Sequence, residues 1–388
     1  IFIIISFLFI TLFLSIPTDK STIGISSDLL DIGDRYFYLN KTPFQGNYLY
    51  PTILNSLTKL SSFFGQTNNS RLWNFLVISI TSILSISTLR LIKETATNLY
   101  DRKISQTAVL IYILNPYTYF FALNGGLTFY VLWGVTLTFN IFSRIPKNFF
   151  LDLNINFLKN IFLISILCLY LSSLRPNASI YSLILISYIF INILIKQKNF
   201  YNSRKILFCS FLILTFSFIF SINSLIKTQS YISQTILIFQ NENGYFFGYS
   251  RDLLRNKISS LNSINLLSSI RSHIYLFVWK ITDSLSGFSD IRDTHDAFNE
   301  NKSLFPFLAR IFTGIFYLIP FNTLTILSLI KYFKYLLKTN TWIIFFAAII
   351  SISPSFIGVA MSRYWIMFYS PFLVLVAKLL NDIFKSEE

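Results

Sequence analysis

The chain has 388 residues, of which 53% are hydrophobic and 13% are charged, and it contains 43 phenylalanines. A soluble domain carries about 25% charged residues, so this composition excludes a soluble globular enzyme, a disordered chain and a disulfide-stabilised secreted scaffold. Apolar runs close to the length of a bilayer crossing recur along the sequence. We therefore predict an all-α integral membrane protein that crosses the membrane many times.

Ten apolar runs are expected to cross the membrane. The first ends near Ile16 and is shorter than the roughly 20 residues of a full crossing, so we expect the natural chain to begin before Ile1. The run 306–330 has Pro320 at its middle and is either one span or two half-helices. The remaining runs lie at about 72–92, 104–122, 127–143, 160–174, 179–195, 206–225, 342–360 and 364–384.

Basic residues in the short connections orient these spans, because cytoplasmic loops are enriched in Lys and Arg. The opposite short turns hold only Arg175 and Arg363. Two long polar segments, 17–70 and 226–305, then face the extracytoplasmic side of one polytopic domain, 1–388. This topology explains the net charge of +15 without nucleic acid as a partner. The basic set expected on the cytoplasmic side is Lys93, Arg102, Lys103, Arg144, Lys147, Lys159, Lys196, Lys198, Arg204, Lys205, Lys331, Lys334, Lys338 and Lys385.

The segment 17–70 carries three aspartates, Asp28, Asp31 and Asp34, spaced three residues apart. On one continuous helical face these carboxylates would repel each other. Gly33 breaks the helix, and Asp34 then serves as the N-cap of a short helix.

Asp34 would lie just above the membrane beside Arg35, Tyr36 and Tyr38. A carboxylate in this position suits a general base that acts on an acceptor hydroxyl. Together the three aspartates also offer the hard oxygen ligands that Mg²⁺ or Mn²⁺ prefers. The alternative is a solvated loop with an Asp cap and a surface Asp–Arg pair.

Further along this segment, Pro51 occupies the favoured first turn of a predicted helix, 51–60. One face of that helix is apolar, so we expect it to lie flat at the membrane interface. The apolar face comprises Ile53, Leu54, Leu57 and Leu60.

Gly33-Asp34-x-x-x-Tyr38, after the first span, is followed by Tyr50-Pro51 at the start of the next helix. This arrangement resembles the first loop of the GT-C superfamily of polytopic membrane glycosyltransferases. Two other places agree with the resemblance. Asn115-Pro116-Tyr117-Thr118-Tyr119-Phe120 ends the third span, and Ser362-Arg363-Tyr364 precedes the last span, which has Pro371 inside it.

The resemblance implies a GT-C-like fold. It also implies an enzyme that takes a sugar from a polyprenyl-phosphate donor in the outer leaflet and passes it to a lipid-linked or glycan acceptor. Asp34 would be the general base, and Asp31 or Asp28 would assist it or hold a Mg²⁺ or Mn²⁺ ion. The tyrosines that would shape the sugar pocket are Tyr36, Tyr38 and Tyr364.

Arg175 and Arg363 are each the only basic residue in a short outer turn. Guanidinium suits bidentate recognition of phosphate and can stabilise the charge that develops on a phosphate leaving group. The alternative is that each arginine snorkels to lipid head groups. Arg251 and Arg255 lie one turn apart on a predicted amphipathic surface helix and are additional phosphate-binding candidates.

Two other functions stay open at this point. An O-antigen or exopolysaccharide polymerase or ligase also has many spans and outer arginines, but depends less on a first-loop carboxylate. A transporter or flippase for lipid-linked sugars would carry charged residues inside its spans. For all three functions we expect a bacterial inner membrane, with the site on its extracytoplasmic side.

Overall fold

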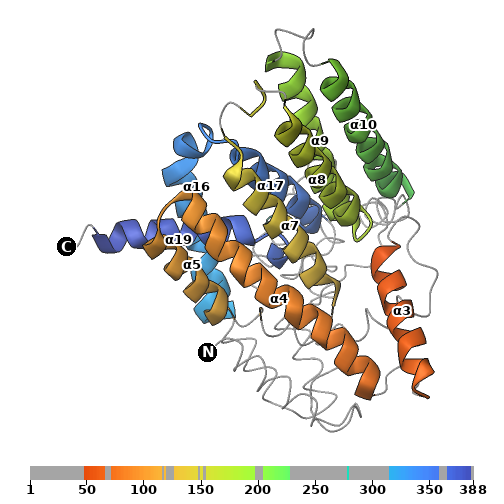
Figure 1. Cartoon of the computed structure of the whole chain (residues 1–388). Helices are drawn as coiled ribbons and strands as arrows, with labels where there is room; N and C mark the ends of the chain where they lie inside the picture. Colours follow the sequence, from red (N-terminus) through yellow and green to blue (C-terminus); the bar gives the residue numbers. More distant parts are fainter. Residues whose placement is uncertain are drawn as a thin grey trace, which may run out of the picture.

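The computed structural model describes residues 48–65, 71–115, 118, 126–146, 149–151, 154–196, 204–227, 278, 314–357 and 365–385. Helices account for most of these residues, and no strand occurs among them. The elements, shown in Figure 1, are α3 (Leu49–Phe63), α4 (Arg71–Leu99), α5 (Arg102–Leu114), α7 (Leu127–Arg144), α8 (Ile155–Ser172), α9 (Pro176–Lys196), α10 (Arg204–Lys227), the π-helical turn η1 (Gly314–Leu318), α16 (Ile319–Leu336), α17 (Trp342–Ile357) and α19 (Ser370–Lys385).

Several of these helices are long and apolar enough to cross a membrane. Within the described ranges there are five: Phe75–Leu99, Ile155–Ser172, Pro176–Ile195, Arg204–Ile226 and Gly314–Leu336. The predicted all-helical membrane class is confirmed to this extent.

The two faces of α10 indicate that its outer surface is suited to lipid and not to water. Its inward face is a row of buried serines, Ser210, Ser217, Ser221 and Ser224. Its outward face carries large apolar side chains, among them Phe208 and Phe216, the latter 64% exposed. A helix on a water-soluble protein has the opposite pattern, whereas helices in a bilayer pack through small and polar residues and turn apolar side chains toward lipid.

The end of α5 differs from the predicted span 104–122, because the helix stops at Leu114. Asp101 caps its first turn, accepting the Ile104 N–H at 2.8 Å. At the other end Asn115 has extended backbone angles. Pro116 explains this, since the residue before a proline is driven out of the helical region.

Around Pro320 the described chain runs as one continuous helix from Gly314 to Leu336, not as two half-helices. The turn before the proline is π-helical, η1, and α16 continues with Pro320 in its first turn. Proline has no N–H and its ring collides with the carbonyl four residues earlier. Widening the preceding turn accommodates that collision without breaking the helix.

The last predicted span, 364–384, is interrupted near its start. Trp365 and Ile366 are helical, a turn follows at Met367 and Phe368, and α19 begins at Ser370. Pro371 therefore does not lie inside a span as predicted. It sits in the first turn of α19, where its missing N–H is not needed.

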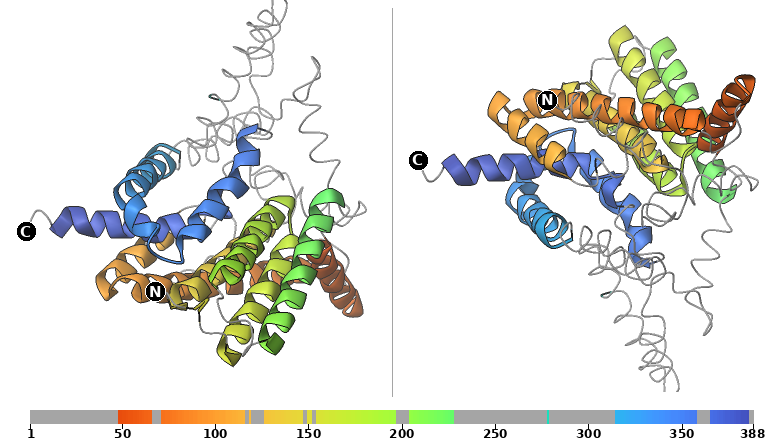
Figure 2. Two further views of the ribbon diagram at one scale, coloured as in Figure 1. Left: turned by 90° about the horizontal axis from the view of Figure 1, so that it is seen from above. Right: turned by 90° about the horizontal axis from the view of Figure 1, so that it is seen from below.

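The first half of α19 is buried on all sides. Every residue from 365 to 377 is buried, and Figure 2 shows α19 running between α5 and α16 in both views. Phe372 stacks on Trp365 at 5.1 Å and meets the edge of Phe345 at 5.8 Å. A helical segment that is apolar all round belongs in the interior of a bundle, so the first half of α19 is part of the core.

Contacts between helix ends group the connections into two ends of the bundle. Arg144 at the end of α7 pairs with Glu94 near the end of α4 at 2.8 Å. Lys385 at the end of α19 lies 4.0 Å from Asp101 at the start of α5, and Asn340 donates to the Pro146 carbonyl at 3.0 Å. We call this the basic end, because it gathers Lys93, Arg102, Lys103, Arg144, Lys331, Lys334, Lys338 and Lys385 from the predicted cytoplasmic set.

Candidate functional site

Arg175 is the one predicted site residue that the described ranges include. It lies at the opposite end of the bundle from the basic end. The other predicted site residues, Asp28, Asp31, Asp34, Tyr36, Tyr38, Arg251, Arg255, Arg363 and Tyr364, lie outside the described residues.

The turn between α8 and α9 holds Arg175 by local hydrogen bonds. The N–H of Arg175 reaches the Leu171 carbonyl at 3.4 Å, and the Ser179 N–H donates to the Arg175 carbonyl at 3.0 Å. Pro176 then opens α9, since its fixed backbone angle suits the first helical position. The turn is therefore specified by the sequence Arg175-Pro176.

The Arg175 side chain points into the bundle. Its Nη1 lies 3.6 Å from the sulfur of Met367, and only 9% of the residue is exposed. A snorkelling arginine keeps its charged head in water, so this burial argues against the snorkelling alternative. A buried guanidinium is instead expected to take part in specific polar interactions.

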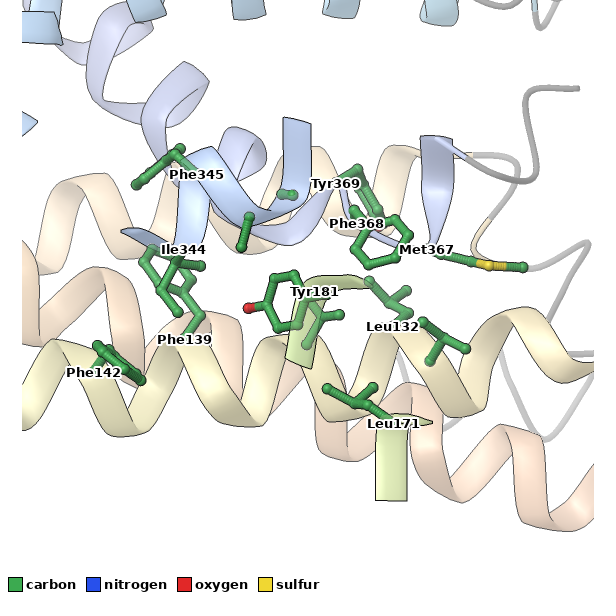
Figure 3. Close-up of a cluster of buried hydrophobic side chains, with 14 of the residues drawn as sticks. Leu132, Phe139, Phe142, Leu171, Tyr181, Ile344, Phe345, Met367, Phe368 and Tyr369 are labelled. Carbon is green, nitrogen blue, oxygen red and sulfur yellow. The ribbon is translucent and has the colours of Figure 1, made fainter. Parts of the chain in front are cut away.

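Met367 brings a second predicted segment to the turn. It lies four residues after Arg363 and belongs to the segment that leads into α19. In Figure 3 its side chain extends away from Tyr181, while Phe368 packs against that tyrosine, with ring centroids 5.7 Å apart. The contact thus joins the α8–α9 turn to a segment 192 residues further along the chain.

The start of α3 brings a third segment to the same turn. The Leu49 N–H donates to the Ser173 carbonyl at 3.2 Å, and Tyr50 is fully buried with its ring 5.4 Å from that of Tyr130. Helix α3 forms the later part of the first long polar segment, 17–70. Its predicted helical character is confirmed, and Leu54 on the expected apolar face is fully buried, whereas Leu60 is exposed.

A fourth contact ties the end of α5 to the segment that contains Met367. Thr118 donates to the Tyr112 carbonyl at 3.0 Å, and its hydroxyl lies 3.4 Å from that of Tyr369. The rings of Tyr112 and Tyr369 are parallel, with centroids 6.5 Å apart. The motif that begins at Asn115 and the segment that contains Tyr369 are therefore neighbours.

Serines hold the turn against α10. The hydroxyls of Ser172 and Ser221 are 2.7 Å apart, and Ser224 donates to the Ser172 carbonyl at 2.6 Å. Ser179 reaches the same carbonyl at 3.2 Å. Because α10 leads into the second long polar segment, this network places that segment's start beside the Arg175 turn.

Sequence reasoning missed Met367, Tyr369 and the serine network. A methionine or tyrosine in an apolar run is typical of packing, and serines in membrane helices are common, so no local signal separates these residues from their neighbours. Among the residues that the structure describes, no group of three or more His, Cys, Asp and Glu could hold a metal ion. The three aspartates predicted to bind Mg²⁺ or Mn²⁺ lie outside those residues.

The arrangement places a buried guanidinium at the start of a long helix, where three sequence-distant segments meet. The positive end of the helix dipole and the guanidinium both favour an anion at this place. In comparisons with known proteins, no family model and no curated sequence matches the chain, and no solved structure matches its fold.

Proposed function

We propose that this protein is a GT-C-like glycosyltransferase. It takes a sugar from a polyprenyl-phosphate donor in the outer leaflet and transfers it to a lipid-linked or glycan acceptor. One observation carries the proposal: the turn around Arg175 contacts the start of α3 through Ser173 and the segment after Arg363 through Met367. A transferase needs its base and its phosphate-binding groups close together, and these contacts join the segments that would supply them.

In this proposal the first outer segment supplies the general base. Asp34 accepts the proton of the acceptor hydroxyl, and Asp31 assists it or, with Asp28, holds a Mg²⁺ or Mn²⁺ ion. Arg175 and Arg363 neutralise the phosphate that leaves the sugar. Further phosphate contacts would come from Arg251 and Arg255, and the sugar pocket from Tyr36, Tyr38 and Tyr364.

The proposed topology has ten spans, with the basic end in the cytoplasm of a bacterial inner membrane. The grouping of helix ends supports it. The ends that carry Glu94, Arg144 and Lys385 meet at one end of the bundle, as alternating spans require. Arg175 then faces the extracytoplasmic side, where lipid-linked sugars would be presented.

Replacing Asp34 with Asn tests the proposal. With a polyprenyl-phosphate sugar and an acceptor lipid in proteoliposomes, D34N should lower the transfer rate by about 10²–10⁴-fold, the usual contribution of a general base. The matched control is Asp101→Asn at the basic end. Asn caps helices as well as Asp does, so D101N should transfer sugar at the wild-type rate.

Unchanged transfer by D34N would refute the assignment of Asp34 and favour the polymerase or ligase. Movement of lipid-linked sugar across vesicles without a new glycosidic bond would favour the transporter. That alternative predicts functional charges inside the spans. Lys378, however, pairs with Asp382 on the next turn of α19 at 2.8 Å, and Tyr332 donates to the same carboxylate at 2.6 Å, which is a satisfied structural pair.

A further inference from the structure

The first turn of α9 offers hydrogen-bond donors beside Arg175. The Ser179 N–H makes the first bond of the helix, to the Arg175 carbonyl, so the backbone N–H groups of Asn177 and Ala178 have no acceptor within α9. Pro176 contributes no N–H. These two N–H groups lie at the positive end of a helix of 21 residues.

The Asn177 side chain adds a second, independent observation. The residue is 2% exposed, and its Nδ2 has no hydrogen-bond partner in the part of the chain that the structure describes. Buried amide donors are nearly always paired, because an unpaired one destabilises the fold. In a helix the Cα–Cβ bond tilts toward the N-terminus, so the Asn177 side chain leaves the backbone on the side of the turn that carries Arg175, two residues earlier.

We propose that the N-terminus of α9 binds a phosphate group, with the Asn177 amide donating a hydrogen bond to a phosphate oxygen beside Arg175. The chemistry fits the donors: a helix N-terminus and a neutral amide recognise oxygen acceptors, and the guanidinium supplies the countercharge. The identification of this phosphate with that of the lipid carrier rests on the proposed function. Phosphate recognition itself does not.

The test measures binding, not sugar transfer. The full chain is purified in detergent, and its thermal stabilisation is followed against inorganic phosphate, geranyl phosphate and geraniol, which lacks the phosphate. In Asn177→Ala the apparent affinity for geranyl phosphate should fall about tenfold or more, as expected for a lost hydrogen bond to a charged group. Asn177→Ser restores one donor and should recover part of the affinity.

Asn192→Ala is the matched control, since Asn192 lies on α9 and donates to the Tyr188 carbonyl at 2.9 Å. It should bind all probes as the wild type does. Weakening of both phosphate probes by N177A supports phosphate recognition at this site, and weakening of geranyl phosphate alone identifies the lipid-linked source. Wild-type affinity of N177A for both overturns the proposal, as does equal weakening for geraniol.

If N177A is not recovered as a folded protein, Asn177→Asp takes its place on the same criteria, because it keeps the shape of the side chain and replaces the Nδ2 donor with an acceptor oxygen. The outcome is separable from that of the proposed function. Loss of phosphate binding in N177A, together with unchanged transfer in D34N, would retain this site and reject Asp34 as the general base of the proposed function.

Discussion

The contact between α7 and α8 predicts a strong coupling between Gly134 and Leu171. A methyl group added at Gly134 would lie 2.8 Å from Cδ2 of Leu171 and 2.9 Å from Cε1 of Tyr170. Carbon atoms in contact prefer about 3.5–4.0 Å, so the neighbouring side chains must move. Overpacking of this kind costs about 1–3 kcal/mol, and the better helix propensity of Ala offsets up to about 1 kcal/mol. We expect Gly134→Ala to destabilise the protein by about 1–2 kcal/mol.

Leu171 is fully buried, and Leu171→Ala should cost about 2–5 kcal/mol through the cavity it leaves. In the double variant the new methyl group no longer meets the Leu171 side chain, and only its close contact with the end of the Tyr170 ring remains. The double variant should therefore be more stable than the sum of the two single changes predicts, by about 1 kcal/mol or more. Reversible unfolding in mixed micelles, with increasing SDS, measures all three variants.

Additivity within about 0.5 kcal/mol would refute this reasoning, because it would mean that the two positions do not touch. The result also bears on function. The α7–α8 contact lies directly before the turn that carries Arg175, since Leu171 accepts the N–H groups of both Leu174 and Arg175.

Two further predictions concern topology and the phosphate-binding arginine. In a cysteine-free background, a membrane-impermeant maleimide should label Ser62→Cys on α3 in intact cells. It should label Lys338→Cys at the basic end only after the cells are permeabilised. The reverse pattern would invert the proposed orientation. Arg175→Lys keeps the charge but loses the planar pair of donors, so kcat/KM for sugar transfer should fall about 10–100-fold. Arg144→Lys at the exposed pair with Glu94 should stay within about twofold, and an equal loss in both variants would contradict the role of Arg175.

Helix positions were largely predictable because they depend on local sequence. The predicted run 127–143 corresponds to α7 (Leu127–Arg144), and the predicted run 179–195 corresponds to α9 (Pro176–Lys196). Apolar length determines where a helix can cross a bilayer, and short-range signals such as the Asp101 cap and Pro176 determine where it starts. Where the predicted bounds were wrong, at 104–122 and 364–384, a proline ended or started the helix.

Hydropathy could not separate the helices that face lipid from those that face protein. The sequences of α10 and α19 are both apolar stretches. In the structure, however, Phe216 of α10 is exposed, whereas Val376 of α19 is buried. A lipid chain and a leucine side chain are equally apolar, so the transfer from water that hydropathy measures is the same in both cases. Only packing distinguishes them.

The sequence alone was sufficient to predict a multi-span helical protein with Arg175 in a turn opposite the basic connections. The features used were composition, the lengths of the apolar runs and the distribution of charges between the connections, all of which depend on residues close together in the chain. Tertiary structure alone decided that the Arg175 side chain is buried against Met367 and that Leu49 is bonded to Ser173. Contacts across more than a hundred residues depend on how whole helices pack against one another. No local sequence pattern predicts that packing. The segments of the candidate site come together because of the way the helices pack.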